Sequence, residues 1–321
     1  MSPVKLWNRL IARYSRKRIY MLTYLAIIGL IAGLMHLLSI IDLYHSSVLY
    51  ILVPYLVSVL ITLFRPAGPA TGLLARYLSH VMTVLVVFLS TSILIGEGFV
   101  CIIFFAPIYL FVVTCTYAVR ALSRRNGSNL HITAWPVLIV FFSLEGTTPS
   151  LTLPRDNSIE VLRSTHLSID QIKANLAKPF SLQKDRHWLL SIFPMPYQID
   201  AGSLEPGDIH TVHTRYHRWF VANTHEGKAE LLIEHVGPNR ITTRVLSDST
   251  YFTTYLTGLG TEINLLPNAS GGTDIALRIH YRRNLNPAWY FHPLQAFGVE
   301  KMGQLIIEEL IVRQPSLATQ T

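Results

Sequence analysis

The sequence predicts two parts of different fold class, a multi-pass α-helical membrane domain followed by an α+β domain. Long uncharged apolar runs fill most of the first 145 residues, and the whole net positive charge lies there as well. Further along, the apolar spacing changes from helical to alternating. We expect a basic N-terminal segment, a transmembrane domain, a linker, a second domain and a tail at residues 1–18, 19–145, 146–157, 158–312 and 313–321.

The charge distribution separates the two parts. The first 145 residues hold 11 Lys or Arg against 3 acidic residues, whereas the rest holds 16 of each sign, so the formal net charge of +8 belongs to the apolar part. The basic residues flank apolar runs, where they act as topology signals and contact lipid headgroups. We therefore expect membrane lipids as partners and no nucleic acid, and the sequence does not identify protein partners.

Four apolar runs are predicted to cross the membrane. Residues 19–41 carry no charge and would form a helix of about 34 Å, enough for a hydrocarbon core of about 30 Å. The length of this run and the lack of a small-residue cleavage site favour an uncleaved anchor over a signal peptide. The other three runs are residues 48–64, 77–95 and 99–119.

A fifth apolar run, residues 130–144, decides the side of the second domain. It would reach only about 22 Å and contains Trp135-Pro136. The basic loops place the N-terminus in the cytoplasm, so a fifth crossing exports the second domain, while an interfacial segment leaves it inside. We favour the crossing. Three histidines are candidates for an intramembrane role. His36 lies late in the first run, whereas His80 and His131 lie near the ends of theirs, where an imidazole can reach the wet interface. We favour the interfacial interpretation.

The second domain reads as strand, helices, several antiparallel strands and one long helix. In residues 274–283, apolar side chains alternate with polar ones, as in a strand with one buried face. Further strands are expected near 159–168, 208–220, 228–236, 240–247 and 251–266, with a turn at His225-Glu226-Gly227. The region 169–192 reads as helical, and a long helix is expected over about 287–312.

This order resembles the helix-grip fold of the START-like superfamily, also called SRPBCC, which includes polyketide cyclases and lipid-transfer domains. The resemblance covers residues 158–312 and rests on the order of elements, on the stretch EVLRSTHLSIDQIKANL at 160–176 and on the helix FGVEKMGQLIIEEL at 297–310. It implies a curved antiparallel sheet around the long C-terminal helix, enclosing an apolar ligand cavity. We recognise no family for the membrane part.

Inward-facing residues are the candidate ligand contacts, because a few convergent polar groups orient a ligand in an apolar cavity. Taken singly, each polar candidate also fits a satisfied core residue. Small residues such as Gly298 and Gly303 would leave room along the helix. The candidates are Thr214, Tyr216, His235, Thr243, Thr261 and Tyr281 on the strands, and Phe291, Leu294, Gln295, Gly298, Met302 and Leu305 on the helix.

No catalytic, metal or cofactor site is predicted. His213 and His217 are spaced like a helical metal pair, but in a strand they would lie about 13 Å apart, too far to share an ion. With Arg215 they would form an outward cationic row, either solvated or near anionic headgroups. The second domain has no Cys, and Cys101 and Cys115 lie in one apolar run, so no disulfide framework is expected.

Three functions follow. The first is a membrane-anchored binding or transfer domain for a hydrophobic small molecule or lipid. The second is an enzyme of polyketide cyclase or dehydrase type, which would need an inner-face His paired with a carboxylate or Tyr. The third is a non-catalytic assembly protein with a collapsed cavity.

Overall fold

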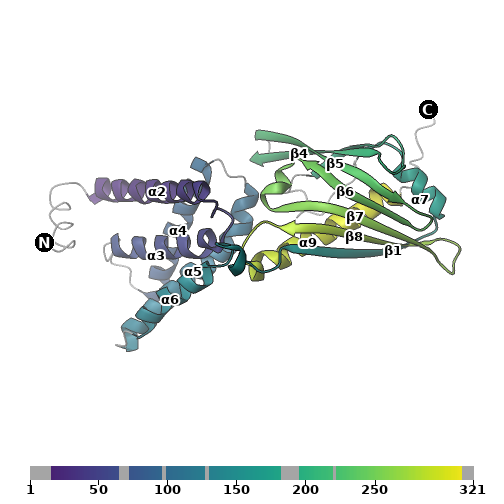
Figure 1. Ribbon diagram of the computed structural model, residues 1–321. Helices are drawn as coiled ribbons and strands as arrows, with labels where there is room; N and C mark the ends of the chain where they lie inside the picture. The colour runs from purple at the N-terminus through teal and green to yellow at the C-terminus, as the bar shows by residue number, and fades with distance from the viewer. Residues whose placement is uncertain are drawn as a thin grey trace. The chain divides into compact units, whose positions relative to one another are not determined.

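The computed structural model describes residues 16–64, 72–95, 99–126, 130–181, 195–219 and 222–312 (Figure 1). The chain divides into two compact units, Met1–Thr152 and Leu153–Thr321. The first is helical and the second is built on one antiparallel sheet.

The helices of the first unit follow the apolar runs. Three of them contain apolar windows long enough to cross a membrane, Thr23–Ile40, Leu73–Ser90 and Phe104–Ser123. The apolar helices Val48–Leu63 and Ala134–Ser143 are shorter. The run 48–64, expected to cross like the long ones, therefore belongs with the short run 130–144. The helices are α2 (Arg16–Ile40), α3 (Val53–Phe64) after the π-turn η1 (Val48–Leu52), α4 (Leu73–Ile95), α5 (Phe99–Asn126) and α6 (Leu130–Ser143).

Polar contacts join neighbouring helices of this unit. His80 on α4 is buried, and its Nε2 lies 2.9 Å from the Ser58 hydroxyl on α3. The Tyr109 hydroxyl of α5 donates to the Leu49 carbonyl at 2.9 Å. The expectation that His80 reaches the interface is therefore wrong, because a buried helix contact holds its ring. His36 is exposed on α2, and the side chain of His131 lies outside the described residues.

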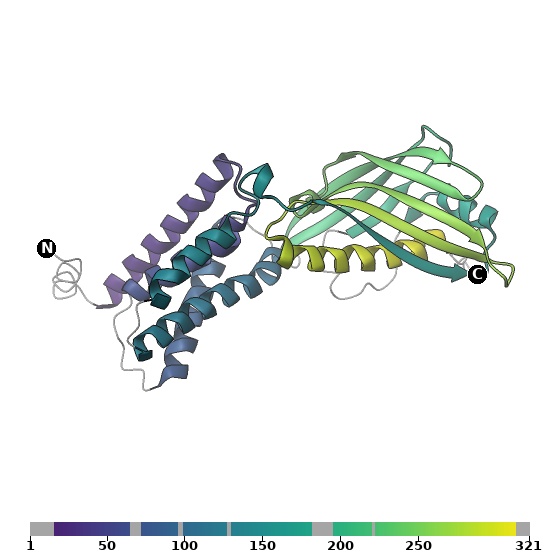
Figure 2. The ribbon, with the colours of Figure 1, turned by 60° about the horizontal axis from the view of Figure 1, so that its bottom comes forward.

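The second unit is an eight-stranded antiparallel sheet in the order β1-β8-β7-β6-β5-β4-β3-β2. Figure 2 shows the sheet arched over the long helix α9 (Ala288–Ile306), which continues into the π-turn η4 (Ile307–Ile311). This is the helix-grip arrangement, so the predicted fold class is confirmed. The strands are β1 (Asp156–Thr165), β2 (Phe180–Ser181), β3 (Met195–Asp200), β4 (Ile209–Trp219), β5 (Ala222–Val236), β6 (Arg240–Asp248), β7 (Leu256–Pro267) and β8 (Thr273–Arg283).

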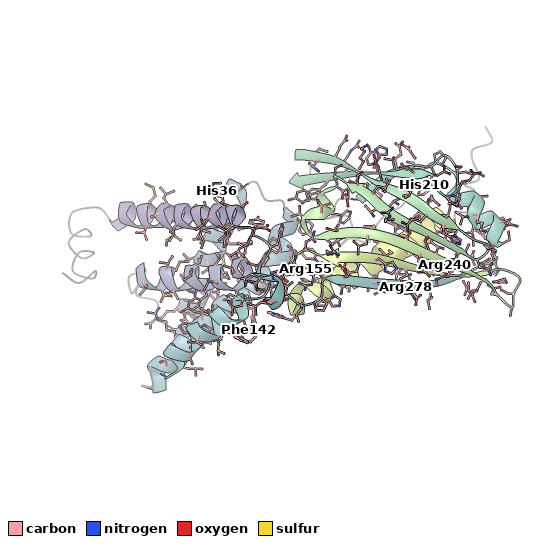
Figure 3. The ribbon with its side chains drawn as sticks, in the orientation of Figure 1. His36, Phe142, Arg155, His210, Arg240 and Arg278 are labelled. Atoms are coloured by element: carbon pink, nitrogen blue, oxygen red, sulfur yellow. The ribbon has the colours of Figure 1, made fainter. Side chains whose placement is uncertain are left out.

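The two faces of the sheet differ as the alternation in β8 predicts. Ile275 and Leu277 are buried in the core beneath α9 and α7 (Ile169–Leu176). On the outer face lies Arg278, which Figure 3 labels. It pairs with Glu160 of β1 at 2.9 Å. Burial of the apolar face drives the packing, while the exposed ion pair adds little to stability.

Residues 225–227, where the sequence predicts a turn between β4 and β5, belong to a strand instead. The strands stay paired from Ile209↔Leu232 to Trp219↔Ala222, so residues 225–227 are inside β5. Gly227 is there because of close packing rather than a turn, since a Cβ on it would lie 2.6 Å from the Ser249 carbonyl oxygen. The 3-10 turn η3 (Tyr251–Thr254) likewise replaces the expected start of β7. Within the expected helical region 169–192, residues 182–192 lie outside the described part.

Candidate ligand cavity

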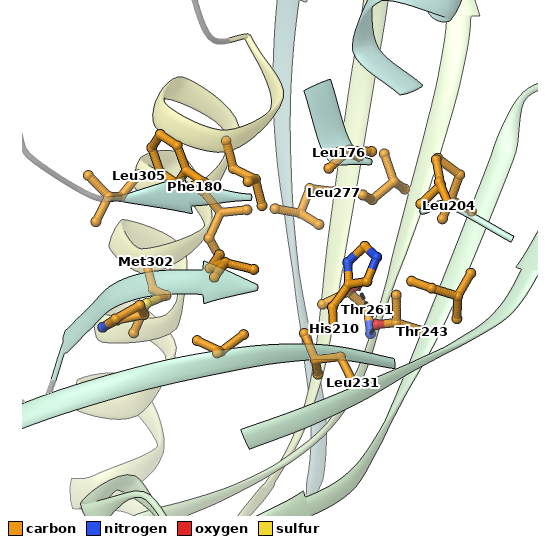
Figure 4. Close-up of a pocket in the computed structure, with 18 residues that line it drawn as sticks. Leu176, Phe180, Leu204, His210, Leu231, Thr243, Thr261, Leu277, Met302 and Leu305 are labelled. Carbon is orange, nitrogen blue, oxygen red and sulfur yellow. Dashed lines mark hydrogen bonds between the residues drawn. The ribbon is translucent and has the colours of Figure 1, made fainter. Parts of the chain in front are cut away.

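A cavity of about 130 Å³ lies between the C-terminal half of α9 and the inner face of the sheet (Figure 4). Strands β2 to β8 contribute to its wall, together with α7 and η4. The wall is almost entirely apolar. It consists of Leu176, Phe180, Pro196, Ile199, Leu204, His210, Val212, Leu231, Ile233, Ile241, Thr243, Thr261, Ile263, Leu277, Met302, Leu305, Ile306 and Leu310.

Two threonines on neighbouring strands form a polar point in this wall. Thr243 of β6 and Thr261 of β7 are directly paired in the ladder, and their hydroxyl oxygens lie 2.8 Å apart. The backbone N–H of Thr261 also donates to the Thr243 hydroxyl at 3.1 Å. The two side chains therefore act as one hydroxyl pair on the inner face.

His210 is the second polar point, and its ring stands among the apolar side chains of the wall (Figure 4). Its Nε2 lies 2.6 Å from the Ser203 carbonyl oxygen. Because a carbonyl only accepts, Nε2 carries the proton. Nearby, Asp208 accepts hydrogen bonds from the Ser203 hydroxyl and the Glu205 backbone N–H, which lower the pKa of its carboxyl below the usual value.

Four of the candidates named from the sequence line the cavity, namely Thr243, Thr261, Met302 and Leu305. The remaining candidates lie elsewhere in the second unit. They are Thr214, Tyr216, His235, Tyr281, Phe291, Leu294, Gln295 and Gly298.

His235 was expected on the inner face but is exposed. Ile233 pairs with Thr243, whereas His235 pairs with Thr242, so the register of β5 against β6 shifts by one residue at Glu234. Such a β-bulge reverses the faces that follow it. Simple alternation from Leu231 and Ile233 therefore fails at His235.

Several other candidates pack near the first half of α9. Tyr216 stacks on Tyr251, with ring centroids 4.8 Å apart. Gln295 Nε2 donates to the Tyr255 carbonyl at 2.8 Å, and Phe291 is fully buried. Tyr281 is also fully buried, which raises the pKa of its hydroxyl. This half of the interface is packed with aromatic rings.

Thr214 and the two glycines of α9 have different surroundings. The Thr214 hydroxyl is buried and donates to the Gly227 carbonyl at 3.1 Å. A Cβ on Gly298 would meet nothing within 4 Å. Gly303 leaves no room, because a Cβ there would lie 2.8 Å from Val161 Cγ2 and 3.2 Å from Ile279 Cδ1. The glycine instead permits close approach of α9 to β1.

His210 is the polar wall residue that sequence reasoning missed. Alternate residues of a strand face the same side, and the sequence places Val212, Thr214 and Tyr216 of β4 on the inner face. His210 precedes them by one step of this alternation, so the same rule would have found it. Phe180, in the two-residue strand β2, and Leu204, in the loop after β3, carry no periodic signal in the sequence.

The residues of the expected cationic row on β4 have acidic partners where their side chains are described. His213 Nε2 lies 2.8 Å from Asp200, and Arg215 pairs with Glu226 at 2.9 Å. The side chain of His217 lies outside the described residues. Across the described part of the chain, no cluster of three potential metal ligands occurs.

The structural neighbours of this chain are START-like and Bet v 1-like proteins that cover about half of it. A Chromobacterium violaceum protein matches 49% of this chain and 99% of its own at 15% identity and a TM-score of 0.31. A Streptomyces aromatase/cyclase matches 47% and 89% at 13% identity and 0.30. A START superfamily protein from Mycobacterium smegmatis matches 46% and 93% at 10% identity and 0.29. No family model and no curated protein matches the chain. The assignment of the fold rests on the strand order of this chain's sheet and on its long C-terminal helix.

Proposed function

We propose that this chain is a membrane-anchored binding domain for a hydrophobic small molecule or lipid, with α9 and the curved sheet holding the ligand. The observation that carries the proposal is the cavity, whose described wall has only three polar residues, His210, Thr243 and Thr261. An apolar pocket with a few polar groups is the usual form of a small-molecule site.

The volume of the cavity sets the size of what it holds. A dry apolar cavity of about 150 Å³ accommodates a benzene molecule. At about 130 Å³, this one fits a ring or a short chain segment of similar size. A longer ligand would place one group in the cavity and the rest outside, or would widen the wall on binding.

The first unit supports the anchoring role. Apolar side chains are exposed on each of its span-length helices, for example Leu30, Met82 and Phe111, each more than half exposed. Lipid is the solvent in which such surfaces are stable. The second unit begins at Leu153, ten residues after α6 ends at Ser143, so the tether reaches at most about 35 Å. This proximity would keep the domain at high effective concentration near lipid-dissolved ligands.

The enzymatic alternative needs an inner-face histidine paired with a carboxylate or a tyrosine. The histidine in the wall, His210, donates to a backbone carbonyl instead. A carbonyl fixes the ring but takes no part in proton transfer. The geometry therefore favours binding over acid–base chemistry.

The test is mass spectrometry of small molecules that co-purify with the full-length, detergent-solubilised protein. Leu231→Trp fills the cavity, and Leu246→Trp makes the same change at an exposed position of β6. We expect an apolar compound with the wild type and with Leu246→Trp, and its loss with Leu231→Trp. Equal amounts in both variants would show that the compound does not occupy the cavity.

We also propose that the second domain lies outside the cytoplasm, with the N-terminus inside. The basic segments 65–76 and 120–125 support this orientation. When both short apolar helices span, these basic segments are cytoplasmic, and the five crossings put the two ends of the first unit on opposite sides. If neither spanned, an N-terminus inside would put both basic segments outside, so the proposal requires the five-crossing arrangement.

A cysteine at Ser270 tests the side, in a background with Cys101 and Cys115 replaced. Ser270 is exposed in the loop between β7 and β8. A membrane-impermeant thiol reagent should label it in intact cells. Labelling only after the cytoplasmic side is opened would place the domain inside.

A further inference from the structure

We infer that the ligand is an uncharged molecule whose buried group carries a hydrogen-bond acceptor, such as a carbonyl or ether oxygen, directed at the Thr243–Thr261 pair. This inference rests on the proposed binding function and specifies the chemistry of the same cavity. It follows from the hydrogen-bond inventory of the wall.

The threonine pair has one proton to spare. Its two hydroxyls carry two protons, and one of them makes the bond between Thr243 and Thr261. The Thr261 backbone N–H adds a donor to Thr243 and consumes an acceptor site. Whichever threonine donates in the mutual bond, the other keeps an O–H with no acceptor in the described part of the chain.

A spare donor in an apolar wall is unfavourable unless something accepts it. The two threonines are partly buried, and a ligand that displaces water from their hydroxyls without accepting a hydrogen bond leaves the spare donor unsatisfied. The neighbouring wall offers aliphatic side chains, with Ile233 beside Thr243 on β5 and Ile263 two residues after Thr261. A ligand acceptor would restore the missing bond, whereas a purely hydrocarbon ligand would leave the proton unpaired.

The same wall disfavours charge. None of its described residues is acidic or basic apart from His210. That ring uses its Nε2 proton on the Ser203 carbonyl, so in its neutral form it offers the cavity only the acceptor Nδ1. A carboxylate, phosphate or ammonium group in the cavity would lack a counter-ion there, and burying an unpaired charge is strongly unfavourable.

Three probes of similar ring size separate these alternatives. Cyclohexanone and methylcyclohexane have the same number of heavy atoms but differ in the acceptor oxygen, and cyclohexanecarboxylate carries a charge. Dissociation constants are measured by ligand-observed NMR on the full-length protein in detergent. Because partitioning into micelles is the same for every variant, the comparison uses the ratio of variant to wild type.

The variants are Thr243→Val, Thr261→Val and the double substitution. Each single variant keeps one hydroxyl proton, so cyclohexanone affinity should stay within about twofold of wild type. The double variant has none, and cyclohexanone should bind about threefold to tenfold more weakly, the effect of one neutral hydrogen bond. Methylcyclohexane should bind the double variant at least as tightly as the wild type, because no hydroxyl proton is left unpaired there. Thr243→Val also removes the acceptor of the Thr261 N–H, so it controls for that loss.

The outcomes distinguish the inference from the proposed function. If methylcyclohexane binds saturably but the double variant does not weaken cyclohexanone, the cavity binds apolar molecules and the role of the threonine pair is wrong. Saturable cyclohexanecarboxylate binding that Leu231→Trp abolishes would also overturn the inference, because it would show that the cavity takes a charged group. If no probe binds the wild type, or if Leu231→Trp does not abolish binding, the proposed function itself fails.

Discussion

Replacing Gly303 by alanine tests how closely α9 packs on the sheet. The new Cβ would lie 2.8 Å from Val161 Cγ2 on β1, well inside the separation that carbon atoms tolerate. Val161 is stiff at χ1, so the helix or the strand has to shift, at a cost of about 1–3 kcal/mol. Alanine in a helix interior gains about 0.5–1 kcal/mol over glycine. The net result should be a loss of up to about 2.5 kcal/mol.

Gly298→Ala is the matched control, because it lies on the same helix with open space around its Cβ. It should stabilise the domain by about 0.5–1 kcal/mol. The helix-propensity gain cancels between the two variants, so their difference of about 1–3 kcal/mol isolates the clash. Pulse proteolysis of the full-length protein in urea measures both free energies of unfolding. If Gly303→Ala is as stable as Gly298→Ala, the close contact between α9 and β1 is wrong.

Three further predictions concern polar groups. Tyr281→Phe should leave the free energy of unfolding unchanged or raise it by up to about 1 kcal/mol, because its buried hydroxyl has no hydrogen-bond partner among the described residues; a loss above 1 kcal/mol in urea unfolding would reveal a partner. A double-mutant cycle of Ser58→Ala and His80→Phe should give a coupling of about 0.6 kcal/mol in detergent unfolding, and zero coupling would contradict the helix contact. Because the folded-state pKa of Asp208 is lowered, its stabilisation is present above the unfolded-state pKa of about 4 and is lost as pH falls through the folded value. Asp208→Asn should therefore be less stable at pH 7 and should flatten the acid limb of a thermal-unfolding profile.

The fold was predictable because its two strongest signals are repeated along the chain. Uncharged runs in the first unit and alternation in β8 each extend over many residues, so single exceptions do not hide them. Single residues typical of turns were less informative about where the strands end. Gly227 resembles a turn residue in sequence, yet it lies inside β5 because the backbone at Ser249 packs against it. A glycine required by a turn and one required by close packing look the same in sequence.

The site was only partly predictable because cavity walls depend on exceptions to periodicity. One bulged residue at Glu234 moved His235 to the outer face, and bulges carry no clear sequence mark. On α9, the helical wheel showed which residues share a face. It did not show where along the helix the close packing against the sheet ends and the cavity begins. Phe291 and Met302 share a predicted face, yet one is packed in the core and the other lines the cavity.

That division of α9 determines where the domain can adapt to a ligand. The first half is held by Phe291, by the bond from Gln295 to the Tyr255 carbonyl and by aromatic packing beneath it. The cavity lies under the second half, which ends in the π-turn Ile307–Ile311, a geometry that is rare and often found at functional sites. The Asn175 side chain of α7 donates to the Ile311 carbonyl at 3.0 Å, so α7 and the end of α9 are coupled. If a larger ligand widens the wall rather than extending out of the cavity, we expect α7 and the end of α9 to move together, because this bond joins them, while the first half of α9 keeps its place on the sheet.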